Sequence, residues 1–76
     1  MKNLDDIETG QTVVIDSFSD NELALKLMEM GCLPGEKVAV ERKAPLGDPI
    51  AVSVSGYLLS LRKSEAKTIL VNDSVA

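Results

Sequence analysis

Few residues of this chain have side chains that could bind a metal ion. The 76 residues include no histidine and a single cysteine, Cys32. Asp5, Asp6 and Glu8 form a close group of carboxylates, whose oxygens suit hard cations. No histidine or cysteine cluster with the spacing of a transition-metal site accompanies them. We therefore expect no metal site and no cofactor, and we interpret the three acidic residues as a solvated N-terminal segment.

Nucleophilic catalysis also lacks its usual components. Without histidine a serine hydroxyl has no base of the usual kind beside it, and no glycine-rich loop leads from a strand into a helix to hold phosphate. Cys32 has no basic neighbour in the sequence that would lower the pKa of its thiol, so we expect a small buried hydrophobic side chain. The sequence indicates a protein that is not an enzyme.

Two pairs of basic residues occur in a chain whose net charge is −4. They are Arg42 with Lys43 and Arg62 with Lys63, each pair at the end of a predicted strand. Solvated surface is the simplest interpretation. Alternatively, an arginine binds a carboxylate or phosphate of a partner, with Arg42 as the first candidate.

The segment APLGDP at 44–49 combines two prolines with a glycine. Pro45 and Pro49 each restrict φ to about −65° and remove an amide donor. Gly47 is free of Cβ restraint, and Asp48 can accept hydrogen bonds from loop amides in an Asx turn. The loop is therefore preset and loses less entropy on binding. Leu46, at its centre, either folds back to close one end of the molecule, the use that we favour, or projects as an apolar anchor.

Short strands must position these residues. Runs of β-branched and alternating apolar residues predict strands over 12–18, 36–44, 50–55, 57–62 and 68–71. Ser55 and Gly56 suit a tight hairpin between the third and fourth of these strands. Five strands with a single helical interruption favour a small closed or half-closed barrel, because barrel closure removes exposed sheet edges.

One helix and one helical turn complete the predicted elements. Ser19 and Glu22 have the spacing of a capping box, so a helix is predicted to start at Ser19 and to end at Gly31. Leu23, Leu27 and Met30 lie on one apolar face of that helix and are expected to cover the sheet. The segment KSEAK at 63–67 predicts a helical turn capped by Ser64.

Length, charge and hydropathy limit the remaining function classes. We expect one domain, 1–76, with an aliphatic core, because aromatic residues make up 3% of the chain. An acidic chain with a pI near 4.6 is a poor ligand for nucleic acid. The apolar runs are far shorter than the roughly 18 residues that span a bilayer, and the N-terminus lacks the plan of a secretion signal. We expect a cytoplasmic protein without direct membrane insertion.

The segment 27–71 resembles the ferrous iron transport protein A family. The resemblance is carried by Met-Gly and Leu-Pro-Gly within 30–35, by APLGDP at 44–49 and by LRKSEA at 61–66, in that order. It implies a mainly β, SH3-like barrel in the cytoplasm, at the inner face of the membrane through a partner. It further implies an accessory or regulatory protein of bacterial ferrous iron uptake, which assists a membrane iron permease carrying a GTP-binding domain and has no catalytic activity of its own.

Docking to the permease would use the proline loop and its basic neighbours. The expected partner-binding residues are Arg42, Pro45, Leu46, Gly47, Asp48, Pro49 and Arg62. A stronger hypothesis places an arginine in the permease's nucleotide site to accelerate GTP hydrolysis, which requires a mobile residue rather than one at a strand end. A similar barrel ends the iron-dependent repressors, so a stand-alone repressor-like module that mediates dimerisation or regulation, with weak self-association, is the alternative. A third class, the SH3 module that binds proline-rich peptides, needs an aromatic groove, which Phe18 and Tyr57 alone cannot build.

Overall fold

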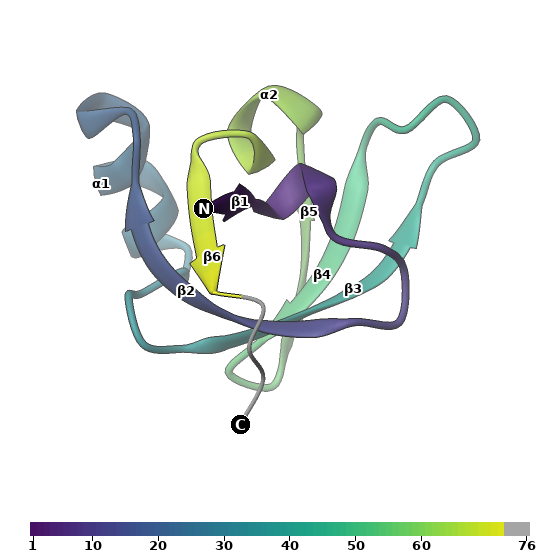
Figure 1. The fold of residues 1–76 in the computed structure, drawn as a ribbon, viewed down its shortest axis with the longest axis horizontal. Helices are drawn as coiled ribbons and strands as arrows, with labels where there is room; N and C mark the ends of the chain where they lie inside the picture. The colour runs from purple at the N-terminus through teal and green to yellow at the C-terminus, as the bar shows by residue number, and fades with distance from the viewer. Residues whose placement is uncertain (73–76) are drawn as a thin grey trace.

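The computed structural model describes residues 1–72, which form a mainly β fold. In chain order the elements are β1 (Lys2–Asn3), the 3-10 turn η1 (Leu4–Asp6), β2 (Thr12–Phe18), α1 (Asn21–Glu29), β3 (Lys37–Lys43), β4 (Ile50–Val54), β5 (Tyr57–Leu61), α2 (Lys63–Ala66) and β6 (Ile69–Asn72) (Figure 1). All five predicted strands are present, whereas β1 and η1 were not predicted. Within residues 1–72 no helix has the length and apolar character to cross a bilayer.

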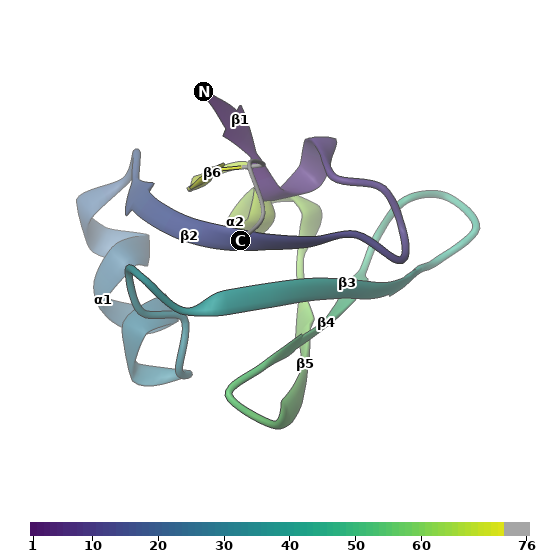
Figure 2. The ribbon, with the colours of Figure 1, turned by 60° about the horizontal axis from the view of Figure 1, so that its bottom comes forward.

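The strands form a single antiparallel sheet in the order β1-β6-β2-β3-β4-β5. The register shifts between Ile15 and Ser17 on β2, and between Val40 and Arg42 on β3. Such bulges bend a strand and increase its twist, and the sheet is strongly curved (Figures 1 and 2). β1 and β5 remain as the two edges of the sheet. Of the closed and half-closed forms that the strand spacing left open, the sheet adopts the half-closed one.

The core fills the concave side of this sheet and is aliphatic, as expected. The alternation of β3 and β4 turns Val38, Val40 and Val52 inward, where they are fully buried. Cys32 is buried among them, as predicted. The complete buried cluster is Leu4, Ile7, Val13, Ile15, Leu27, Cys32, Val38, Val40, Ile50, Val52, Val54, Leu61, Ala66, Ile69 and Val71.

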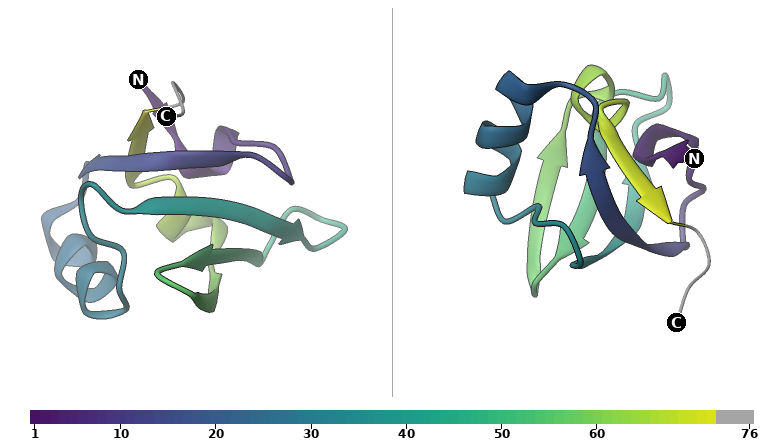
Figure 3. Two further views of the ribbon diagram at one scale, coloured as in Figure 1. Left: turned by 90° about the horizontal axis from the view of Figure 1, so that it is seen from below. Right: turned by 60° about the vertical axis from the view of Figure 1, so that its left-hand side comes forward.

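Helix α1 lies at one end of the curved sheet (Figure 3) and starts later than predicted. Its N-cap is Asp20 rather than Ser19, and the Asp20 carboxylate accepts hydrogen bonds from the amides of Glu22 (2.9 Å) and Leu23 (3.0 Å). The Ser19 amide donates instead to the carbonyl of Thr68 at 2.9 Å. Ser19 therefore still continues the β2–β6 pairing, which delays the helix.

The predicted apolar face and helix stop are both confirmed. Leu27 is fully buried, and Leu23 and Met30 are partly buried against the core. Gly31 ends the helix with φ of +106°, a left-handed conformation that glycine adopts readily. α1 thus covers the sheet with the side chains that the sequence indicated.

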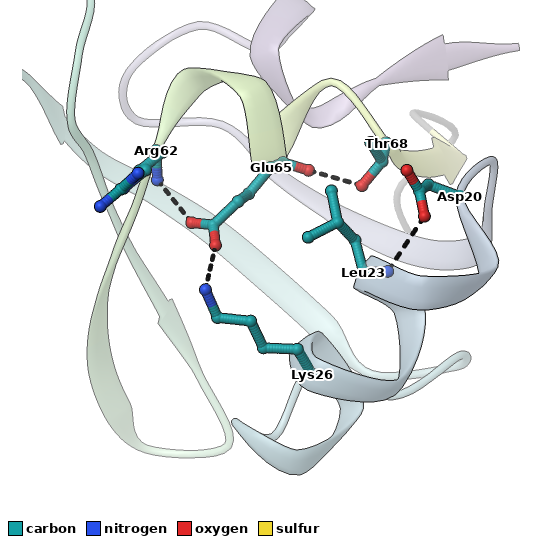
Figure 4. A network of polar contacts seen from close by, with 6 residues as sticks. All are labelled: Asp20, Leu23, Lys26, Arg62, Glu65 and Thr68. Atoms are coloured by element: carbon teal, nitrogen blue, oxygen red, sulfur yellow. Dashed lines mark hydrogen bonds and ion pairs between the residues drawn. The ribbon is translucent and has the colours of Figure 1, made fainter.

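Helix α2 is the predicted helical turn, but Ser64 does not cap it. The turn begins after Arg62, whose amide donates to the Glu65 carboxylate at 2.8 Å. The other carboxylate oxygen accepts from Lys26 Nζ on α1, also at 2.8 Å (Figure 4). The Lys26 hydrogen bond and then the Arg62 amide lower the pKa of Glu65 below its usual value. Glu65 is only 6% exposed, and its charge joins the two helices.

Candidate functional site

The proline loop, residues 44–49, connects β3 to β4 and is held by its own backbone. The Gly47 amide donates to the Ala44 carbonyl at 2.7 Å, and the Ala44 amide donates to the Pro49 carbonyl at 3.0 Å. Gly47 has φ of +87°, a conformation that costs little only for glycine. The loop therefore has a defined conformation without a partner, as the two prolines predicted.

Asp48 attaches this loop to helix α2. Its Oδ1 accepts a hydrogen bond from the Lys63 amide at 3.0 Å. The prediction of an Asx turn, in which Asp48 accepts from amides of its own loop, is wrong. The loop amides of Gly47 and Ala44 already have carbonyl acceptors, so the carboxylate serves the first amide of α2. Asp48 thus fixes the position of the loop, rather than its internal turn.

The N-terminal turn η1 contacts two lysines that lie next to the proline loop. Lys43 Nζ donates to the Asp5 carbonyl at 3.0 Å, and Lys63 Nζ lies 3.8 Å from Asp5 Oδ2. The neighbours of Asp5, Leu4 and Ile7, are buried in the core. This end of the sheet is therefore closed by the N-terminal segment, whose role the sequence did not reveal.

Leu46 projects from the tip of the loop and is 94% exposed. Closure of the sheet by Leu46, the use that we favoured from the sequence, is wrong, because Leu46 is exposed and does not belong to the buried core, whereas Leu4 and Ile7 of the N-terminal segment do. An exposed leucine on a preset loop has the geometry of an apolar anchor. The remaining alternative, projection toward a partner, matches the position of this side chain.

A groove of about 470 Å³ opens beside the proline loop. Its floor follows the register across three strands, in which Arg42 of β3 lies opposite Ala51 of β4, and Ala51 lies opposite Ser60 of β5. The small side chains of Ala51 and Ser60 leave space above this floor. The full lining, called the loop groove below, is Arg42, Lys43, Ala44, Pro45, Pro49, Ala51, Leu58, Leu59 and Ser60.

The structure brings together only some of the predicted site residues. Arg42, Pro45 and Pro49 line the loop groove. Leu46 lies outside this lining, at the exposed loop tip. Gly47 forms the turn within the loop, Asp48 attaches the loop to α2, and Arg62 is exposed at the end of β5.

Leu58 is a groove residue that the sequence reasoning missed. It is 65% exposed and lies on the opposite face of β5 from Leu59 and Leu61. A signal was available, since three leucines at 58, 59 and 61 cannot all face the core of an alternating strand. The groove thus has an apolar wall from β5 as well as from the proline loop.

The FeoA domain family matches residues 2–73, almost the whole chain. The chain belongs to the FeoA family. A solved FeoA-like protein from Clostridium acetobutylicum is 41% identical, covers 99% of this chain and 88% of its own, and superposes with a TM-score of 0.89. A FeoA from Stenotrophomonas maltophilia, solved in complex with zinc and described as an SH3 domain protein, is 30% identical, covers 95% and 91% of the two chains, and has a TM-score of 0.81. The predicted SH3-like fold is confirmed.

One FeoA relative joins this domain to a transporter. The Fe(2+) transport protein A/Fe(2+) transporter FeoB fusion protein of Porphyromonas gingivalis is 32% identical over 69 residues, which are 90% of this chain. This chain spans 8% of the length of that fusion protein. Manganese-dependent transcriptional repressors share the fold, with 18% identity and a TM-score of 0.86 over 36% of one repressor chain.

The interpretation of the acidic N-terminal residues of this FeoA chain as a solvated segment is wrong for Asp5, whose side chain is only 14% exposed. The Asp6 carboxylate accepts from the Asn3 amide at 3.2 Å, and Asp5 lies beside Lys63. Within residues 1–72 no group of three or more potential ligands could hold a metal ion. Burial, followed by the Glu65 charge, raises the pKa of the Cys32 thiol, so the thiolate is disfavoured at neutral pH. These groups fit structural roles.

Proposed function

We propose that this protein is an accessory or regulatory protein of ferrous iron uptake that docks to the GTP-binding membrane iron permease without catalysing a reaction. The observation that carries the proposal is the preset proline loop, which holds Leu46 94% exposed beside the loop groove. The fusion of a relative to FeoB supports the choice of partner. Domains that are fused in one organism are often partners in another, so the permease is the first protein to test.

The charges around the loop suit a docking surface. Arg42 and Arg62 are exposed, whereas Lys43 and Lys63 are partly buried and contact Asp5. The two arginines are therefore available to carboxylates or phosphates of a partner. Both stand at strand ends, which favours positioning against a surface over insertion of a mobile arginine into a nucleotide site. Docking would hold the protein at the cytoplasmic face of the membrane.

Membrane retention tests the proposal directly. Membranes that contain the iron permease of the same organism should retain the protein, and membranes from cells lacking the permease should not. We expect Arg42→Glu to reduce the retained amount at least about fivefold, because a charge reversal places like charges at the interface. Lys37→Glu is the matched control, since Lys37 is also exposed on β3 but lies outside the loop groove.

The repressor-like alternative predicts a different result. The likeness to the repressors shows a shared fold, and a module of that kind would self-associate or follow a DNA-bound complex rather than the permease. Equal retention by membranes with and without the permease would contradict the docking proposal. An equal loss of membrane retention for Arg42→Glu and Lys37→Glu would show that the loop groove is not part of the docking surface.

A further inference from the structure

β5 forms an edge of the sheet, and its backbone geometry is set by the hairpin that precedes it. Ser55 and Gly56 have φ of +52° and +81°, the combination of a type I′ turn. Val54 and Tyr57 are paired across this two-residue turn, so they form a hydrogen-bonded pair. The alternation of the antiparallel ladder is thereby determined along β5.

Two residues of β5 direct their backbone groups away from β4. Leu59 and Leu61 form the next hydrogen-bonded pairs with β4, since hydrogen-bonded and open pairs alternate. The amides and carbonyls of Leu58 and Ser60 therefore point to the open edge. In the part of the chain that the structure describes, β4 is the one strand paired with β5. Figure 3 shows the β4–β5 hairpin at the margin of the sheet.

This edge lacks the features that normally prevent strand pairing. Natural edges carry charged residues, proline, bulges or very short strands. The sequence of β5, YLLSL, has no charge and no proline, and its register with β4 shows no shift. Tyr57 and Leu58 are 71% and 65% exposed. The opposite edge, β1, is only two residues long and starts with Lys2. β5 is therefore the edge that is open to a further strand.

The charges beside β5 indicate the chemistry of the added strand. Arg62 follows the strand directly, and Arg42 lies across the loop groove from Ser60. Both guanidinium groups are exposed on a chain of net charge −4. An acidic segment complements them. A second copy of β5 does not, because in antiparallel self-pairing Arg62 would lie near the partner's hairpin tip, residues 54–57, which contains no carboxylate.

We propose that β5 accepts an extended acidic segment of a partner protein as an additional strand of the sheet. This strand would pair with the free amides and carbonyls of Leu58 and Ser60, place an apolar side chain in the loop groove, and place a carboxylate beside Arg62 or Arg42. Leu58 and Ser60 belong both to the edge and to the groove lining, so one segment can occupy both. The inference rests on the proposed docking function and specifies its mode.

Two substitutions at Ser60 distinguish the contribution of its backbone amide to binding from that of its side chain. Ser60→Pro removes the outward amide and leaves the hydrogen bonds to β4 in place, because proline is tolerated on the solvent side of an edge strand. Ser60→Val keeps the amide and favours the strand. With the purified cytoplasmic domain of the permease as probe, we expect Ser60→Pro to weaken binding about tenfold and Ser60→Val to change it less than about twofold. Unfolding curves establish that both variants fold.

Amide hydrogen exchange in the wild-type protein gives an independent measurement. Binding should slow exchange at Leu58 and Ser60, whereas Leu59 and Leu61 are already protected by β4. Wild-type binding with unchanged exchange at Leu58 and Ser60 would overturn the added strand and leave the docking proposal intact. Slower exchange at Leu58 and Ser60 that appears as the concentration of the protein alone rises would show that β5 pairs with a second copy. That result would also overturn the added strand from a partner. No binding by the wild-type chain would overturn both proposals.

Discussion

Within residues 1–72, Glu65 is the one buried charged residue. Its hydrogen-bond partners explain why the buried charge is tolerated. A buried carboxylate is costly unless hydrogen bonds and an opposite charge compensate it. The Arg62 amide and Lys26 Nζ do so, each at 2.8 Å. The Lys26 side chain is largely exposed and the Glu65 side chain is buried, so this ion pair lies at the boundary between core and solvent. A single carboxylate thus holds α1 against α2.

Glu65→Gln should destabilise the protein by about 1–2 kcal/mol, because the neutral amide keeps the acceptor for the Arg62 amide but loses the charge opposite Lys26. Urea unfolding measures the change. Glu29→Gln is the matched control, since Glu29 is an exposed glutamate on α1. An equal effect of the two substitutions would show that the contact with Lys26 contributes no stability.

The lowered pKa of Glu65 gives this contribution a pH dependence. A carboxyl with a lower pKa in the folded state than in the unfolded state stabilises the fold above the unfolded value, and loses that effect as pH falls through the folded value. The wild-type advantage over Glu65→Gln should therefore be full at neutral pH and should decline in the acid range. An advantage that persists at pH values below both pKa values would contradict this origin.

At the scale of elements, the proline loop is positioned by contacts with α2 and η1 rather than by its own sequence alone. Its two internal hydrogen bonds define the turn, and the bond from the Lys63 amide to Asp48 orients it on the fold. Asp5 adds contacts to Lys43 and Lys63 at the loop base. Docking affinity should then depend on residues that do not touch the partner.

Asp48→Ala tests this positioning. Losing the acceptor frees the loop to move, so binding to the permease domain should weaken about threefold while the fold persists. Asp48→Asn retains an acceptor oxygen and should bind nearly as the wild type does. Exchange of the Lys63 amide should accelerate in Asp48→Ala. Unchanged exchange at Lys63, or equal binding losses in both variants, would show that Asp48 does not position the loop.

The sequence predicted the elements whose apolar residues recur with a clear period. It missed those that depend on contacts between residues far apart in the chain. The five strands and the apolar face of α1 follow from alternation and from Leu23, Leu27 and Met30. β1 and η1 escaped prediction because Leu4 and Ile7 are isolated apolar residues in an acidic segment. These same two residues belong to the buried core, whereas Leu46, which we expected to close the sheet, stays outside it.

The site was predictable to a similar extent. The preset loop and the basic strand ends could be read from the residues themselves. The acceptor role of Asp48 toward Lys63 could not, because it depends on how α2 meets the loop. The outward position of Leu58 could be read from the alternation of β5, which places it opposite Leu59 and Leu61, although its part in the groove could not. A tertiary contact, rather than local propensity, decided the role of Asp48.

At the scale of the whole molecule, the FeoA chain is a curved sheet whose concave side is filled and whose outer features gather near one edge. The proline loop, the loop groove and the open edge of β5 are contiguous, since Leu58 and Ser60 contribute to both the groove and the edge. Two exposed arginines border this region of a molecule whose net charge is −4. The proposed docking function therefore lies on one surface, and the aliphatic interior supplies the stability of the fold.

The binding affinity of Leu46→Ala for the cytoplasmic domain of the permease, measured by calorimetry, tests this account most directly. Leu25→Ala is the matched control, because Leu25 is a 63% exposed leucine on α1. We predict that Leu46→Ala weakens binding at least about tenfold, through loss of an apolar anchor, and changes the free energy of unfolding by less than about 0.5 kcal/mol. Leu25→Ala should bind as the wild type does. Wild-type affinity in Leu46→Ala would contradict the account.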